Sequence, residues 1–298
     1  MFYFARLFDR PVYAWHQRRY RYGASALDLL WYDPRGTDAD VARLPLDAWF
    51  HNVDVVFLRG KWNDPDAVFV GLKGGDNRAN HSHLDLGTFV LDAQGQRWAV
   101  DIGADDYNLP GYFGDKRWTY YRLRTEGHNT LVMNGENQDP AAKAPIKAFE
   151  STRDHSFAVA DLSAAYAKSA RGVQRGIAML DRKHVLVQDE IEAETPVDVE
   201  WTMHTNAEAK IDGAVVTLSQ KGEHYTVRAV DAAGGSWSVM PVRLKSPQRP
   251  LENTRKLVLR FQAKPPLTRV AVLLSPSEKS PPPPIRPLRE WHRDQDCE

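Results

Sequence analysis

The stretch VQRGIAMLDRKHVLVQDEI, residues 173–191, carries the pattern that decides the fold. It covers most of two candidate strands, Gly172–Met179 and His184–Glu190, in which apolar side chains recur with a period close to two. Outward from it, similar short segments follow one another from Val53 to Leu274, separated by turn residues such as Asn134-Gly135. About fifteen such strands, with almost no helical period, predict a mainly β protein built as a large antiparallel β-sandwich.

The first 50 residues have a different pattern. Aromatic and aliphatic residues over Phe2–Phe8, a break at Pro11 and further apolar positions through about Tyr32 predict short helices. Residues 33–47 are polar, with proline and glycine, and are expected to form a linker. So much apolar surface on short helices indicates the end of a larger helical domain, which would need a partner surface.

These patterns divide the chain into three expected parts. Residues 1–50 are a helical remnant and linker, and residues 51–275 are the β-sandwich domain. Residues 276–298 contain the run Pro281–Pro284 and are expected to form an extended tail.

The composition excludes several classes of function. Lys plus Arg and Asp plus Glu number 39 each, so no global field draws the chain to nucleic acid or to a membrane. No apolar run is long enough to span a bilayer, and Met1–Arg10 is too short and too charged for a signal peptide. The one cysteine, Cys297, excludes a disulfide framework within the chain. Because positive and negative charges balance, an anionic substrate would have to be held by a local arginine cluster.

The densest polar cluster is GGDNRANHSHLDLG, residues 74–87. His81 and His83 lie two positions apart, so in extended backbone they project to the same side. Asp101 and His128 each lie beside an apolar strand, and with His83 they offer two imidazoles and a carboxylate, a plausible zinc set. The residues alone leave open a capping aspartate, hydrogen-bonded core histidines and, for Asp85, a partner that orients a histidine or caps the strand.

Three segments carry a resemblance to a known family. NHSHLDLG (80–87), AVDIG (99–103) and GHNTLVMNG (127–135) resemble the C-terminal β-domain of heparinase II/III-like polysaccharide lyases. That group includes heparinases and alginate or oligoalginate lyases. The resemblance covers about Val53 to Asp189. It implies β-elimination on an anionic glycan that contains uronate, such as heparan sulfate or alginate.

The resemblance also implies roles for individual residues. His83, Asp101 and His128 match the ligands of a zinc ion that is usually structural, while His81 and its neighbour Asn80 match the substrate-facing, catalytic position. The segment WTYYRLR (118–124) lies in a region where one branch of the family uses a catalytic tyrosine. From this segment, Tyr120 and Tyr121 are candidate catalytic residues, and Arg122 and Arg124 are candidate substrate-binding residues. His204, in a later strand, is a further candidate for substrate binding.

Family members place a helical toroid before the sandwich, and here only short helices precede it. The toroid is therefore expected on another chain or in a longer form of the protein, and a periplasmic or secreted location is implied for that form. An alternative stays open: a non-catalytic carbohydrate-binding or structural sandwich with a structural zinc. The aromatic content of 10% does not separate the two, because aromatic faces stack on sugar rings but also fill β-sandwich cores.

Overall fold

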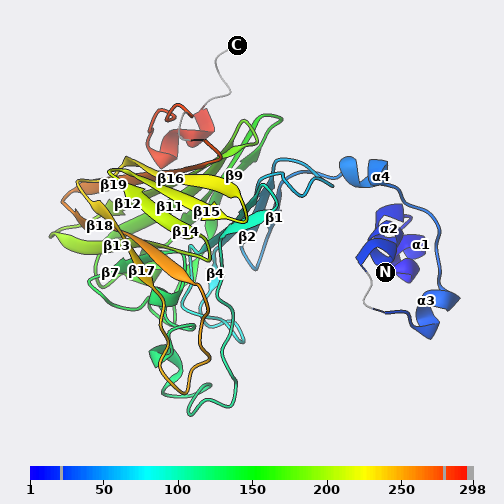
Figure 1. Cartoon of the computed structure of the whole chain (residues 1–298), viewed down its shortest axis with the longest axis horizontal. Helices are drawn as coiled ribbons and strands as arrows, with labels where there is room; N and C mark the ends of the chain where they lie inside the picture. Colours follow the sequence, from blue (N-terminus) through cyan, green and yellow to red (C-terminus); the bar gives the residue numbers. More distant parts are fainter. Residues whose placement is uncertain (21–22, 278–279, 294–298) are drawn as a thin grey trace. The chain divides into compact units, whose positions relative to one another are not determined.

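The computed structural model describes residues 1–20, 23–277 and 280–293 (Figure 1). Cys297 and part of the expected tail lie outside the described residues. The chain divides into two compact units, residues 1–46 with 61–65, and residues 47–60 with 66–298. No helix among the described residues is long and apolar enough to cross a bilayer.

The first unit consists of short helices: α1 (Phe2–Leu7), α2 (Pro11–Tyr20), α3 (Ala26–Leu30) and α4 (Asp38–Ala42). Ser25 and Thr37 begin α3 and α4 with capping boxes, in which the side chain and the third helical residue satisfy each other's backbone amide. The helix α4 falls in the stretch that was expected to be only a linker. It forms there because Thr37 and Asp40 have the spacing of a capping box. The apolar core of this unit is small and centres on Phe2, Ala5 and Ala14.

The second unit is an antiparallel β-sandwich made of three larger sheets and one small one (Figure 1). The eight-stranded sheet has the order β14 (Glu208–Asp212), β15 (Val215–Gln220), β16 (Glu223–Asp231), β19 (Leu267–Ser275), β12 (His184–Glu192), β11 (Gly172–Leu180), β10 (His155–Asp161) and β9 (Ile146–Ser151). The four-stranded sheet has the order β17 (Ser236–Pro241), β18 (Arg255–Ala263), β13 (Val197–Thr205) and β7 (Leu131–Met133). The five-stranded sheet has the order β1 (Ala48–Phe50), β2 (Val55–Arg59), β3 (Phe69–Lys73), β5 (Phe89–Ala93) and β6 (Gln96–Ala99), and β4 (Gly75–Asp76) pairs with β8 (Lys143–Ala144).

One large core joins these sheets and confirms the expected fold class. Val187 of the eight-stranded sheet, Trp201 of the four-stranded sheet and Leu91 of the five-stranded sheet belong to the same buried cluster. Trp98 and Tyr225 stack in this core with ring centroids 5.3 Å apart. Alternate residues of the strands enter this core, which is why the period of two in the sequence was informative.

The strand β11 is buried on both faces, because a C-terminal segment covers the side that faces away from the large core. The 3-10 helix η4 (Leu288–Arg293) contributes the buried Leu288, which packs with Ala178 and Leu186 in a second cluster. A side chain on Gly176 would meet Leu288 Cδ2 at 2.4 Å, so the absence of a side chain there lets η4 pack closely on β11. Part of the expected extended tail is therefore packed on the sandwich.

Two long connections project from one end of the sheets (Figure 1). One joins β6 to β7 and contains the 3-10 helices η1 (Arg117–Thr119) and η2 (Thr125–Gly127). The other joins β17 to β18 and contacts the first: the amide of Tyr121 donates to Gln248 Oε1, and the amide of Arg249 donates to Asp105 Oδ1. These contacts hold the segment that carries most of the candidate site residues.

The remaining 3-10 helix of the described residues, η3 (Ser163–Tyr166), lies between β10 and β11.

Candidate functional site

Two histidines and a carboxylate converge where the connection between β4 and β5 meets the start of β7. One ligand atom each of His83, Asp85 and His128 lies within 4.8 Å of the others, so these residues form a candidate metal-binding triad. The rings of His83 and His128 have centroids 5.2 Å apart. Asp85 is the member that the resemblance did not assign as a ligand, and its carboxylate forms an ion pair with Lys73.

Asp101, the expected third ligand, also lies near His128. Its Oδ2 is 3.6 Å from His128 Nδ1, and its Oδ1 accepts the amide of Gly103. The structure thus places two carboxylates, those of Asp85 and Asp101, near the histidine pair, and Asp101 as a ligand stays a prediction.

The triad fits a metal ion because His128 is buried and unsatisfied. His128 is 2% exposed, and within the described part of the chain neither of its ring nitrogens has a hydrogen-bond partner. Burying ring nitrogens without partners is costly, and a cation bound to one of them would satisfy its lone pair. The preceding Gly127 is required here, because a side chain on it would meet Tyr121 O at 2.0 Å.

The electrostatics keep His83 and Asp101 in the forms that bind cations. Burial, followed by the proximity of His128, lowers the pKa of His83 to about 4, so its imidazole is neutral near pH 7. Burial raises the pKa of Asp101, but His128 and the Gly103 amide lower it more, and the net pKa lies well below the usual value. A neutral imidazole and an ionised carboxylate are protonation states that suit a divalent metal.

A second group of polar residues lies next to the triad. Tyr121 Oη lies 2.8 Å from His204 Nε2, and His204 Nδ1 lies 3.1 Å from Asn129 Oδ1. The side-chain amide of Asn129 donates to the carbonyls of Phe89 and Val100, which turns its oxygen toward His204. His204 Nδ1 is therefore the donor, and its Nε2 accepts the phenol proton of Tyr121.

Burial fixes both partners in their neutral forms. Burial, with smaller contributions from Lys256 and His128, lowers the pKa of His204 well below its usual value. Burial also raises the pKa of Tyr121 above its usual value. The pair is thus a protonated phenol held against an unprotonated imidazole, an arrangement that can pass a proton.

The remaining predicted residues fall into two groups. Asn80 and His81 are exposed, and His81, with φ +61°, stacks on Tyr107. Tyr120 and Arg122 are buried inside the connection between β6 and β7. Tyr120 donates to the carbonyl of Pro110, and Arg122 donates to the carbonyl of Ile102 and lies 3.6 Å from Asp105. Their roles as catalytic and substrate-binding residues stay predictions, and in this structure both side chains already have protein partners.

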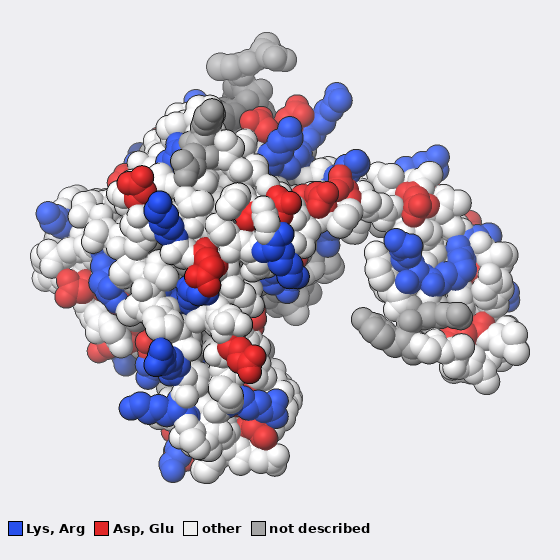
Figure 2. Space-filling view, viewed as in Figure 1, with Lys and Arg blue, Asp and Glu red and all other residues white. Residues whose placement is uncertain are grey.

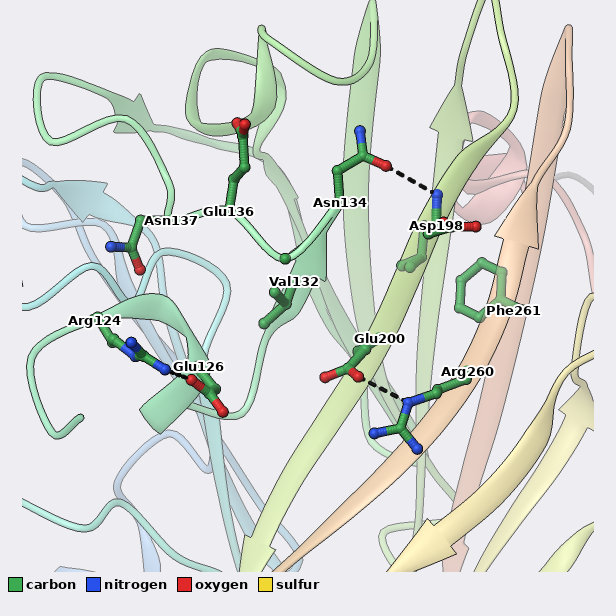
Figure 3. A pocket seen from close by; sticks show the side chains of 12 residues that line it. Arg124, Glu126, Val132, Asn134, Glu136, Asn137, Asp198, Glu200, Arg260 and Phe261 are labelled. Carbon is green, nitrogen blue, oxygen red and sulfur yellow. Dashed lines mark hydrogen bonds and ion pairs between the residues drawn. The ribbon is translucent and has the colours of Figure 1, made fainter. Parts of the chain in front are cut away.

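Arg124 lines a groove of about 790 Å³ beside the four-stranded sheet (Figure 3). It forms an ion pair with Glu126, and Glu200 of β13 is paired with Arg260 on the neighbouring strand β18. Phe261 and Asn134 also line it. Its charges are mixed, as they are on the visible face of the sandwich, where Lys and Arg alternate with Asp and Glu (Figure 2).

The sequence did not indicate two residues of this site as they lie in the structure. Asp85 is in the quoted motif, but only the fold shows that its carboxylate reaches the histidine pair. Asn129 orients His204 from 75 positions away, and that pairing exists only because β7 and β13 are neighbours in the sheet. The only sequence signal for Asn129 was its position directly after His128 in the quoted segment GHNTLVMNG.

Comparison with known proteins agrees with this architecture. Residues 63–282 match the family model described as heparinase II/III-like, C-terminal. A search of curated proteins found no match.

Three solved structures share the fold. The heparan sulfate lyase HepC from Pedobacter heparinus has 18% identity and a TM-score of 0.71, and the match covers 92% of this chain and 40% of that one. The BT4657 heparinase III gene product has 16% identity and a TM-score of 0.69, and the match covers 91% of this chain and 40% of that one. A further heparinase III has 17% identity and a TM-score of 0.64, and the match covers 77% of this chain and 36% of that one. The chain thus spans about two fifths of the length of these proteins. The family match covers most of the chain, and the chain belongs to the heparinase II/III-like family, of which it carries the C-terminal domain.

Proposed function

We propose that this chain is the β-domain of a polysaccharide lyase that cleaves an anionic, uronate-containing glycan by β-elimination. The observation that carries the proposal is the candidate metal-binding triad, whose His128 is followed in the chain by Asn129, the residue that orients His204 toward Tyr121. Heparan sulfate and alginate both have the required chemistry. The helical toroid would come from another chain or from a longer form of the protein, and a periplasmic or secreted location fits that form.

The metal in this proposal is a structural zinc. His83 and His128 are its imidazole ligands, and Asp101, as the family resemblance implies, or Asp85, as the triad suggests, supplies the carboxylate. When bound, zinc would hold together segments that are distant in the sequence. It would thereby fix the loop that presents Asn80 and His81 to the substrate.

The reaction needs three groups, and this chain offers a candidate for each. The uronate carboxylate must be neutralised so that the proton on the adjacent carbon becomes acidic, and hydrogen bonding from the Asn80 amide suits that task. A base must take this proton, and His81 is exposed enough to reach it. An acid must protonate the leaving glycosidic oxygen, and Tyr121 holds its phenol proton because burial raises its pKa. The half-buried Arg124 at the groove, now paired with Glu126, would hold a further anionic group of the glycan.

The test is a lyase assay on the full chain with heparan sulfate and with alginate, with and without the helical domain of a family member, following the unsaturated uronate product. We expect His81→Ala and Tyr121→Phe to reduce turnover by about 10²-fold or more, as loss of a general acid or base does. The matched control is His224→Ala, an exposed histidine on β16. Glycan binding without product in every combination would favour the non-catalytic alternative.

A further inference from the structure

The connection between β6 and β7 exposes two aromatic rings beside His81. Tyr107 is 51% exposed and Phe113 is 57% exposed, although both belong to a segment that is otherwise held by hydrogen bonds. Exposed apolar rings on a loop are unfavourable in water, so a pair of them indicates a binding surface.

The three rings have a defined mutual geometry. Tyr107 stacks on His81 with centroids 5.6 Å apart and planes 17° apart. Phe113 stands nearly perpendicular to both, at 5.5 Å and 88° from His81 and at 5.1 Å and 81° from Tyr107. The rings therefore form a corner with one wall at a right angle to the other two, and it includes the residue proposed to face the substrate.

The corner is supported from below. Tyr112 is buried and contacts both Tyr107 and Phe113, with ring centroids 5.1 Å and 5.0 Å away. The Arg117 guanidinium lies 5.4 Å from the centre of the Phe113 ring. The same guanidinium donates to the carbonyls of Tyr112 and Ser82, which joins this loop to the one that carries His81. Preorganised rings lose little conformational entropy when a ligand binds.

We propose that Tyr107 and Phe113 are a stacking platform for a pyranose ring of the glycan bound beside His81. A pyranose presents an apolar C–H face that suits the negative face of an aromatic ring. The arginine beneath the rings adds positive charge that suits an anionic glycan. Two rings expose far less than the roughly 800 Å² per partner that a stable protein interface needs, so a sugar fits this surface better than a protein does.

The inference deepens the proposed function and rests on it for the class of ligand, because His81 is assigned to the substrate there. It goes further by naming two residues, Tyr107 and Phe113, that would bind a sugar ring next to the bond that is cleaved. Binding and turnover can be measured separately, so the platform can fail while the lyase proposal stands, and the reverse.

The experiment is calorimetric titration of the full chain with size-defined heparan sulfate and alginate oligosaccharides. The variants are Tyr107→Ala, Phe113→Ala and Tyr107→Leu, which keeps apolar bulk but removes the ring. Phe50→Ala is the matched control, since Phe50 of β1 is similarly exposed at 48%. Circular dichroism confirms folding, which substitution of exposed side chains is expected to leave intact.

We expect all three platform variants to bind at least one of the two oligosaccharides about tenfold more weakly than the wild type, and Phe50→Ala to bind it unchanged. Variants that bind like the wild type would overturn the platform, whether or not the chain has lyase activity. A wild-type chain that binds neither oligosaccharide would also overturn it. Ring-dependent binding without any lyase product would keep the platform and reject the proposed reaction.

Discussion

At the scale of single residues, Lys256 of β18 is the least expected group near the candidate site. It is 2% exposed, and its Nζ lies 3.7 Å from Glu126 Oε1 and 3.8 Å from Glu200 Oε2 without a hydrogen-bond partner in the described structure. Burial lowers its pKa to about 8. A buried ammonium held by two long ion pairs and no hydrogen bond destabilises the folded state, and here it lies beside the strand that carries His204.

This arrangement predicts a pH dependence. The folded-state pKa of Lys256 lies below its unfolded value, so the unfolded chain binds more protons between about pH 8 and pH 10.5. The unfolding free energy should therefore rise with pH across that window, by up to about 3 kcal/mol relative to Lys256→Met. Urea unfolding of both proteins at several pH values measures the difference. A difference that stays constant from pH 8 to pH 10.5 would contradict the lowered pKa.

At the scale of elements, a buried ion pair connects the hairpin β11–β12 to the candidate site. Arg175 and Asp189 are fully buried, and Arg175 Nε donates to Asp189 Oδ1 at 2.7 Å. Arg175 Nη1 also donates to the carbonyls of Gly87 and Asn129, at 2.8 Å and 2.9 Å. One side chain thus holds the ends of the two segments that carry Asp85 and His128.

Breaking this pair should cost stability because it leaves a buried charge without a partner. Arg175→Met is expected to lower the unfolding free energy by about 3–5 kcal/mol, measured by urea unfolding. The double variant Arg175→Met/Asp189→Leu should recover much of that loss, because neither charge remains. A double variant that is no more stable than the single one would show that the carbonyl contacts matter more than the pair.

The C-terminal segment is a second element whose role can be tested. Leu288 of η4 is 1% exposed against β11, so Leu288→Ala should cost about 2–5 kcal/mol in urea unfolding. Leu267→Ala is the matched control, because Leu267 is 45% exposed and should lose little. Equal losses in the two variants would mean that η4 does not pack on the sheet.

The strands were more predictable than the connections. The period of two marked segments such as His184–Glu190, which lies within β12, because burial of a strand acts directly on the sequence. β14 and β1 were missed, since the edge strand β14 is mostly exposed, with only Ala209 and Ile211 apolar, and β1 is only three residues long. The linker that contains α4 was likewise interpreted as coil because five residues show no helical period.

The site was predictable only where residues share a motif. His81, His83 and His128 stand out because their segments resemble the family, whereas the contact of Tyr121 with His204 spans 83 positions. Tyr107 and Phe113 gave no signal, because an exposed ring and a core ring are the same letter in a sequence. Distances across a fold depend on strand order, which the sequence pattern leaves open.

At the scale of the whole molecule, the chain combines a helical unit that buries little with a sandwich that holds every candidate site residue. Exposed aromatic and aliphatic side chains on the helical unit, such as Phe4, Phe8 and Leu29, fit the expectation of a partner surface. The sandwich contributes the candidate metal centre and the proton-transfer pair. The account of the molecule therefore depends first on that metal centre.

The most direct measurement is the zinc content of the purified chain by elemental analysis. His83→Ala, His128→Ala, Asp101→Ala and Asp85→Ala are compared with the wild type, and His224→Ala serves as the control. We predict about one zinc per chain in the wild type and the control, and loss of the metal in both triad-histidine variants. The carboxylate variant that also loses zinc identifies the third ligand. Wild-type protein without metal after loading with zinc, or zinc retained in His83→Ala and His128→Ala, would contradict the proposed centre.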